Sequence, residues 1–287
     1  FSVLTILLFF FSFSQEIALD SIQGTEQKLN EVIVSSIRVK YTSPFTHSNV
    51  SKEELSKRNL GQDLPILLNY LPSVVTTSDA GAGIGYTGIR IRGISAQSTN
   101  ITINGIPFND AESHGTYWVN LPDFSSSVES LQVQRGVGTS TNGSGAFGSS
   151  INILTDGISE DPYAEISNSF GSYDSRKHTV KFSSGLLNDS FEISGRLSKI
   201  DSDGYVDRAF SDLKSYFLQG AYKRGNTFLK ALAFGGHEKT YQAWDGLSKE
   251  QIKENRRQNP LTYENEIDNY KQDHYQMHLN QKIDSKW

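Results

Sequence analysis

Residues 191–198 read Phe-Glu-Ile-Ser-Gly-Arg-Leu-Ser, so that apolar or small residues alternate strictly with polar or charged ones. The same two-residue period returns at 216–223 and at 274–283. Further β-rich segments, the last of which alternates poorly, lie at 163–170, 175–185 and 227–236. Successive side chains of a strand point to opposite faces. The pattern therefore predicts a series of antiparallel strands, each with one apolar and one polar face.

The connections between these strands are of two kinds. Tight turns fit Leu187-Asn188-Asp189 and Arg224-Gly225-Asn226, whereas the longest polar connection runs from about His237 to Gln272 and has room for a short helix over Ser248–Asn255. Segments of about ten residues with short turns at one end and long loops at the other are typical of outer-membrane β-barrels. A soluble β-sandwich would bury one face equally well and stays open as the alternative.

The chain begins with an apolar run, Val3 to Phe11, followed by small Ser12 and Ser14. Nine apolar residues are too few for a membrane-spanning helix, but they fit the core of a secretory signal that is cleaved after a small residue. Because position 1 is not Met, we expect residues 1–14 to be a truncated signal peptide. A buried strand at this end is the alternative interpretation.

Residues 15–36 predict an exposed arm, since residues 15–30 are polar and show no period. The arm ends in a β-rich segment: Glu31-Val32-Ile33-Val34-Ser35-Ser36. Such a segment can join the edge of a partner's sheet as an added strand. It can equally be the first strand of the domain that follows.

Residues 37–156 predict a small mixed α/β domain. Ser51 and Glu54 form the sequence pattern of a capping box, and Leu residues at helical spacing predict a second helix between Gly61 and Leu71. Short β runs follow at 89–92, 101–103, 128–134 and 150–154. Asn104-Gly105 is a strong signal for a hairpin turn.

Composition argues against several classes of protein. The chain has 27 Lys plus Arg against 32 Asp plus Glu, a net charge of −5, which gives no sign of nucleic-acid binding. It has no Cys and only six scattered His, and no GxSxG, HExxH or phosphate-loop motif. His274 and His278 lie on the polar face of a strand and are expected to face the lumen rather than bind a metal. We therefore expect neither an enzyme nor a metal or cofactor site.

Six short motifs in one order resemble the TonB-dependent outer-membrane receptors. The segment Glu31–Ser36 resembles the TonB box of that family. The other five resemble the helix end, strands and hairpin of its plug domain, and they lie at 64–74, 89–93, 103–107, 128–136 and 143–153. Each motif is weak alone, whereas six in sequence are specific.

The resemblance implies a plug domain over residues 37–156, followed over 157–287 by the first strands of a transmembrane β-barrel in the bacterial outer membrane. About six strands cannot close a barrel around such a plug, so we expect the chain to be part of a longer receptor. The family imports scarce ligands. The implied partners are TonB at the periplasmic arm, outer-membrane lipid and a small ligand, most simply a ferric siderophore or other iron compound.

The resemblance also supplies candidate site residues. Plug loops that face outward in the family carry side chains suited to a chelate or macrocycle, namely Tyr86, Gln97, His114, Tyr117 and Trp118. Packing against the barrel wall is the alternative for Tyr117 and Trp118. In the family, charged residues of the plug form ion pairs with the barrel wall. The resemblance implies such ion pairs for Arg92, Glu129 and Arg135. Cobalamin, haem or an oligosaccharide remain alternative cargoes, and a secreted or surface-anchored β-rich binding protein is the rival class.

Overall fold

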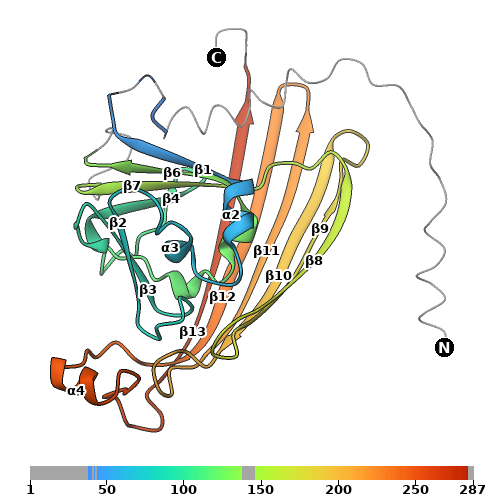
Figure 1. Cartoon of the computed structure of the whole chain (residues 1–287). Helices are drawn as coiled ribbons and strands as arrows, with labels where there is room; N and C mark the ends of the chain where they lie inside the picture. Colours follow the sequence, from blue (N-terminus) through green and yellow to red (C-terminus); the bar gives the residue numbers. More distant parts are fainter. Residues whose placement is uncertain (1–37, 41, 43, 138–145, 284–287) are drawn as a thin grey trace, which may run out of the picture.

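The computed structural model describes residues 38–40, 42, 44–137 and 146–283. The expected signal segment (residues 1–14) and the arm with its β-rich segment Glu31–Ser36 lie outside the described residues. The described part has two bodies: a small mixed α/β domain, here the plug, and a curved antiparallel sheet, here the wall, that covers one side of it (Figure 1). Within this part, no helix has the length and apolar character needed to cross a membrane.

The plug is built on a five-stranded mixed sheet with the order β1-β6-β7-β4-β5. These strands are β1 (His47–Ser51), β4 (Thr99–Ile103), β5 (Ile106–Pro107), β6 (Val128–Arg135) and β7 (Ser149–Thr155). A separate hairpin pairs β2 (Val74–Ser78) with β3 (Thr87–Ile91). Asn104 and Gly105 have positive φ angles of 53° and 82° and join β4 to β5. The predicted two-residue hairpin is thus confirmed.

The helices of the plug are short. Helix α2 (Lys52–Arg58) begins with a reciprocal capping box: Ser51 Oγ accepts from the Glu54 N–H, and the Glu54 carboxylate accepts from the Ser51 N–H, as predicted. The helix predicted over 61–71 is wrong in length, because α3 spans only Leu64–Leu67. Gly61 has a φ of 120°, outside the helical region, and Pro65 occupies the first turn of α3, so the helix does not extend back to Gly61. The described part of the plug also has 3₁₀ turns at η2 (Ala96–Ser98), η3 (Trp118–Asn120) and η4 (Phe124–Ser127).

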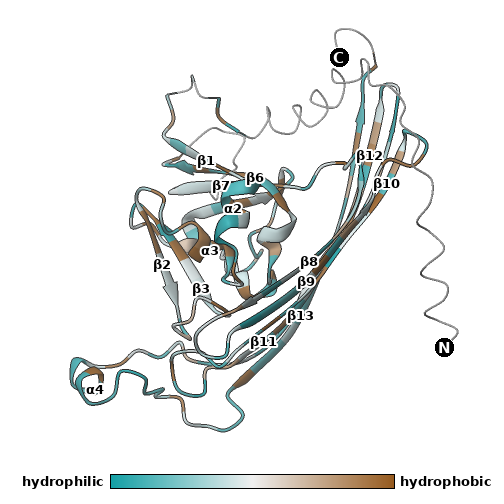
Figure 2. Ribbon diagram, turned by 45° about the vertical axis from the view of Figure 1, so that its right-hand side comes forward, coloured by the Kyte–Doolittle hydropathy of each residue, from teal (hydrophilic) through white to brown (hydrophobic). Residues whose placement is uncertain are grey.

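The wall is a six-stranded sheet in which every strand pairs antiparallel with its neighbour in sequence. Its strands are β8 (Pro162–Phe170), β9 (Arg176–Ser184), β10 (Phe191–Ser202), β11 (Ser211–Arg224), β12 (Thr227–Tyr241) and β13 (Ile267–Gln281). The plug lies on the concave side of this sheet (Figure 2). The prediction of antiparallel strands after a mixed α/β domain is confirmed.

The wall turns its apolar face outward. On β10, Phe191 and Leu197 are 40% and 58% exposed, whereas Glu192 and Arg196 are each 1% exposed and face the plug. The same outward face carries Ile166, Val180, Phe182, Ile193, Leu218, Tyr275, Met277 and Leu279. A soluble sandwich would bury the apolar face and expose the polar one. The arrangement is instead that of a lipid-facing barrel wall around a polar interior.

The longest strand connections of the wall lie at one of its two ends. At one end lie the connections 185–190 and 225–226, and at the other 171–175, 203–210 and 242–266. Helix α4 (Lys249–Glu254), with Ser248 as its N-cap, lies in the longest of them, where the sequence predicted a helix. That loop was predicted to begin near His237, but β12 and β13 stay paired as far as Tyr241 and Ile267. The apolar alternation fades before the main-chain ladder ends, because both faces become polar near the strand ends.

Plug and wall share one hydrophobic core. Phe124 of η4 packs against Phe217 and Phe234 of the wall, with ring centroids 6.4 and 5.3 Å apart. Gly236 of β12 permits a close approach, since a Cβ there would lie 2.4 Å from the backbone oxygen of Asn120. A side chain at this position would therefore push η3 away from the wall.

Candidate functional site

Asp123 is the main polar link between plug and wall. It lies just before η4 with a φ of 52°, a left-handed conformation that Asp tolerates better than most residues. Its carboxylate is 2.7 Å from Nζ of Lys177 on β9 and 3.4 Å from a guanidinium nitrogen of Arg196 on β10. Asn59, Ser126, Thr179 and Ser198 donate further hydrogen bonds to it.

The surroundings of Asp123 stabilise its charged form. Burial alone would raise the pKa of the carboxyl, but the charges of Arg196 and Lys177 outweigh burial and hold the pKa well below its usual range. All three side chains are at most 3% exposed. A buried charge is tolerated only when it is paired and hydrogen-bonded, so the cluster joins the two bodies at a fixed position.

A second link involves Asp156 at the end of the plug. Its carboxylate lies 2.7 Å from Nζ of Lys52 in α2 and 2.5 Å from Nζ of Lys181 on β9. Burial opposes ionisation of Asp156, yet the charges of Lys181 and Lys52 lower its pKa. One carboxylate thus connects a plug helix, the plug's last residues and the wall.

The three charged residues expected to pair with the wall make other contacts. Glu129 lies 3.4 Å from Lys52 within the plug, and Arg135 donates to the Pro72 carbonyl and to Ser48. Arg92 reaches the backbone oxygen of Arg135. In the described residues, the ion pairs between plug and wall have their carboxylates on the plug and their cations on the wall. Pairing of Arg92, Glu129 and Arg135 with wall strands beyond β8–β13 stays a prediction.

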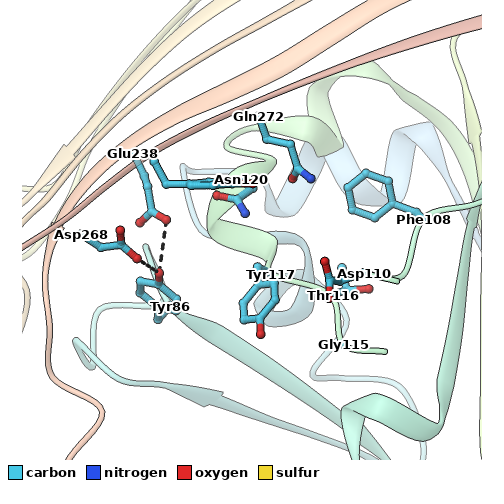
Figure 3. Close-up of a pocket in the computed structure, with 11 residues that line it drawn as sticks. Tyr86, Phe108, Asp110, Gly115, Thr116, Tyr117, Asn120, Glu238, Asp268 and Gln272 are labelled. Carbon is cyan, nitrogen blue, oxygen red and sulfur yellow. Dashed lines mark hydrogen bonds between the residues drawn. The ribbon is translucent and has the colours of Figure 1, made fainter. Parts of the chain in front are cut away.

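A pocket of about 210 Å³ lies between the plug and the long-loop end of β12 and β13 (Figure 3). Plug loops and wall both contribute to its lining, which consists of Tyr86, Phe108, Asp110, Gly115, Thr116, Tyr117, Asn120, Glu238, Asp268, Tyr270 and Gln272. A molecule in this pocket would touch both bodies at once. That is the geometry needed for a ligand to change how the plug sits on the wall.

Tyr86 connects the plug to two carboxylates of the wall inside this pocket. Its hydroxyl lies 2.6 Å from Asp268 Oδ2 and 3.2 Å from Glu238 Oε1. Burial, the hydrogen bond to Asp268 and the charge of Glu238 all raise the pKa of the Tyr86 hydroxyl. The hydroxyl therefore keeps its proton and acts as a hydrogen-bond donor.

The five candidate ligand-binding residues differ in whether they line this pocket. Tyr86 and Tyr117 line the pocket, and Tyr117 is 48% exposed. Trp118, next in sequence, is only 3% exposed and belongs to the shared core, which agrees with the wall-packing alternative. Gln97 and His114 are exposed but are not among the residues that line this pocket. Ligand contact by any of the five stays a prediction.

Sequence reasoning missed the residues that the fold adds to the pocket. Glu238 and Asp268 lie 152 and 182 positions after Tyr86, so only the pairing of β12 with β13 and the seating of the plug bring them together. No local pattern marks Asp123 as a site residue, because Leu121-Pro122-Asp123-Phe124 has the composition of an ordinary loop. In the described part of the chain, no group of three or more His, Cys, Asp or Glu side chains is placed to hold a metal ion.

Comparison with known proteins identifies the plug. Residues 39–150 match the sequence model of the TonB-dependent receptor plug domain. The vitamin B12 transporter BtuB of Vibrio vulnificus is 32% identical over 158 residues, which are 55% of this chain and 25% of that protein. The ferric enterobactin receptor of Pseudomonas aeruginosa is 26% identical over 175 residues, covering 55% of this chain and 24% of the relative.

Solved structures agree on the fold. The ferric yersiniabactin uptake receptor FyuA from Yersinia pestis superposes with a TM-score of 0.63 at 17% identity, covering 85% of this chain and 40% of that one. The siderophore receptor PirA from Acinetobacter baumannii superposes with a TM-score of 0.55 at 20% identity, and the match covers 75% of this chain and 34% of that one. The chain spans about a quarter of the length of the curated relatives it matches. Residues 39–150 thus form a TonB-dependent receptor plug domain, and the six antiparallel strands of the wall follow it.

Proposed function

We propose that this chain is the plug and wall portion of a ligand-gated importer that carries a ferric siderophore or another iron compound across the outer membrane. The observation that carries the proposal is the pocket at the long-loop end, which is lined by plug and wall together. A ligand bound there changes the contacts that hold the two bodies in register. Tyr86 is the most direct route, since it connects a plug loop to β12 and β13.

The proposed cycle uses three parts of the chain. Ligand enters at the long-loop end and contacts Tyr86 and Tyr117. Glu31–Ser36 adds as a strand to TonB on the periplasmic side, and TonB passes on energy from the inner-membrane proton gradient. The plug then moves against the restraint of the Asp123 cluster. Lipid surrounds the apolar outer face of the wall, nucleic acid has no part, and no reaction is catalysed.

Cobalamin is the second candidate cargo. It is favoured by one observation, the 32% identity to a protein named as a vitamin B12 transporter. Two relatives named for ferric enterobactin and for siderophore reception favour iron compounds at 26% and 27% identity. Haem and oligosaccharides remain further alternatives, and a β-rich binding protein without transport is the rival class.

The test is nutrient uptake by cells that express the complete receptor gene and lack their own outer-membrane receptors. Iron-limited cells are offered ferric hydroxamates, ferric catecholates and haem, and a cobalamin auxotroph is offered cyanocobalamin. Growth that requires both the receptor and TonB on an iron compound supports the proposal. Receptor-dependent growth on cyanocobalamin alone would favour the second candidate. Binding without uptake of any compound would favour the rival class.

A further inference from the structure

The pocket between plug and wall is acidic. Asp110, Glu238 and Asp268 line it, and none of the eleven lining residues is Lys, Arg or His. Asp110 is already occupied, because its carboxylate accepts from the N–H groups of Glu112 and Ser113 and from the Ser113 hydroxyl. Across the part of the chain that the structure describes, neither Glu238 nor Asp268 forms an ion pair. Glu238 and Asp268 therefore face this pocket without a cationic partner among the described residues.

These two carboxylates share one proton donor. The Tyr86 hydroxyl lies within 3.2 Å of an oxygen of each, but it carries one hydrogen and can donate fully to one oxygen at a time. The Thr240 hydroxyl donates to the other oxygen of Glu238. Like charges this close repel each other, so a positive charge placed between them would be stabilised by both.

Two further oxygens in the lining lack partners. Asn120 is 7% exposed, and its Oδ1 has no hydrogen-bond partner in the described residues; the same holds for the buried Thr116 Oγ1. Figure 3 shows the Asn120 side chain lying between Glu238 and Tyr117 at the pocket. Buried polar atoms in folded proteins are almost always hydrogen-bonded. Both residues line the pocket, so after a small shift of their side chains these buried oxygens can accept from N–H groups of a bound molecule.

The rest of the lining suits an organic cation better than a bare metal ion. Tyr117 and Tyr270 are 48% and 46% exposed, and Phe108 also lines the pocket. Aromatic faces attract ammonium and guanidinium groups. A metal ion would need more carboxylate or imidazole ligands, and the described residues offer no such group of three.

We propose that this pocket recognises a cationic nitrogen group, an alkylammonium or guanidinium carried by the transported compound. Glu238 and Asp268 supply the charge, Asn120 and Thr116 accept N–H hydrogens, and the tyrosine rings flank the group. The inference rests on the proposed function only in taking the pocket to lie on the ligand's route. It narrows the cargo to compounds that carry a free amine or guanidine.

The test uses the purified full-length receptor in detergent, without TonB, and two probes of nearly equal shape: 2-phenylethylamine, which is cationic at neutral pH, and neutral 2-phenylethanol. Ligand-observed saturation-transfer NMR measures both affinities. The amine should bind about tenfold or more tighter than the alcohol. The double variant Glu238→Gln/Asp268→Asn should lower amine binding to the level of the alcohol and leave alcohol binding unchanged.

Control variants distinguish the loss of charge in the pocket from a general effect on folding. Asp201→Asn removes one carboxylate from the same wall, where it pairs with Lys199 outside the pocket, and should not change amine binding. Tyr86→Phe removes the hydroxyl that competes for the two carboxylates and should tighten amine binding. Asp268→Asn alone, at a half-buried position, keeps the test informative if the double variant fails to fold.

Equal binding of amine and alcohol, no binding of the amine, or undiminished amine binding by the carboxylate variants would overturn the inference. The outcome is independent of uptake. Uptake of an iron chelate by a receptor that ignores the amine would retain the import proposal and reject the cationic pocket. Selective amine binding without uptake of any tested compound would retain the pocket and reject import.

Discussion

Asp123 of the plug and Lys177 of the wall form an ion pair whose atoms are 2.7 Å apart and whose side chains are 0% and 3% exposed. The two residues belong to different bodies, so the pair depends on how the plug is seated. Arg196 and four hydrogen-bond donors complete the surroundings of the carboxylate. Any movement of the plug must break or carry along this cluster.

Asp123→Asn should destabilise the seated plug by roughly 3–5 kcal/mol, because it leaves Lys177 and Arg196 buried without a counter-charge. Asn also tolerates the left-handed backbone at this position. The chain has no Cys, so a fluorophore on Ser56→Cys, an exposed position in α2, can report plug unfolding in urea.

Glu53→Gln is the control for this measurement. Its ion pair with Lys57 is exposed, with side chains 75% and 70% accessible, and its loss should change stability by less than about 0.5 kcal/mol. Equal unfolding midpoints for Asp123→Asn and Glu53→Gln would show that the Asp123 cluster does not hold the plug.

Asp63 should make the plug less stable as the pH rises. Burial, with a smaller contribution from the charge of Glu238, raises the pKa of Asp63 from 3.8 to about 8, against the hydrogen bond from Thr87. Between these values the folded state holds a proton that the unfolded state has released. The stability due to protonated Asp63 is therefore complete below pH 3.8 and is lost as the pH rises toward 8.

Thermal unfolding at about pH 5 and about pH 8 should show a drop that is smaller in Asp63→Asn, because Asn cannot ionise. Asp123 and Asp156 have lowered pKa values, so they act at more acidic pH and do not confound this window. An identical pH dependence in both proteins would mean that Asp63 is ionised in the folded plug.

Neighbouring Tyr117 and Trp118 should respond differently to Ala. Trp118→Ala empties part of the shared core and should cost roughly 3–5 kcal/mol of stability. Tyr117→Ala removes a half-exposed ring from the pocket and should weaken ligand binding by roughly 1–3 kcal/mol with little change in folding. Unfolding midpoints and cell-surface binding of the imported chelate distinguish the two. Poor folding of Tyr117→Ala would assign that ring to wall packing as well.

The loop at 242–266 should face the outside of the cell. Trypsin added to intact cells should cut at exposed Lys253 or Arg256 and spare the exposed Arg224, which lies in the short turn at the opposite end of the wall. Permeabilised cells provide the control in which both ends are accessible. Cleavage at Arg224 with protection of the loop in intact cells would show that the orientation is inverted.

Patterns between residues close in sequence predicted most elements of the fold. The capping box at Ser51 and the Asn104-Gly105 turn depend on neighbours in sequence, and the alternation of β10 reflects an apolar outer face beside a polar interior. Strand ends were less predictable, because β12 continues through His237–Thr240, where both faces are polar.

The site depends on contacts that no local pattern contains. Asp123 meets Lys177 and Arg196 only after the wall has formed and the plug has docked. The sequence predicts Tyr86 as a ligand candidate because it is an aromatic side chain in an outer loop. Its carboxylate partners on β12 and β13 can be identified only when the register of the two strands is known. A sequence read alone can propose the plug side of such a pocket but not the wall side.

We propose that energised import depends on Glu31–Ser36, and proline substitutions in that segment test this dependence. Strand addition requires backbone N–H donors and extended backbone, and proline lacks the donor and fixes φ. Val34→Ala keeps the donor and is the matched control. In the same cells, a radiolabelled ferric chelate that the receptor imports is measured as bound in the cold and accumulated when warm. Val32→Pro and Val34→Pro should bind normally and fail to accumulate the chelate, with Val34→Ala milder. Normal accumulation by both proline variants would show that Glu31–Ser36 is not the segment that couples the receptor to TonB.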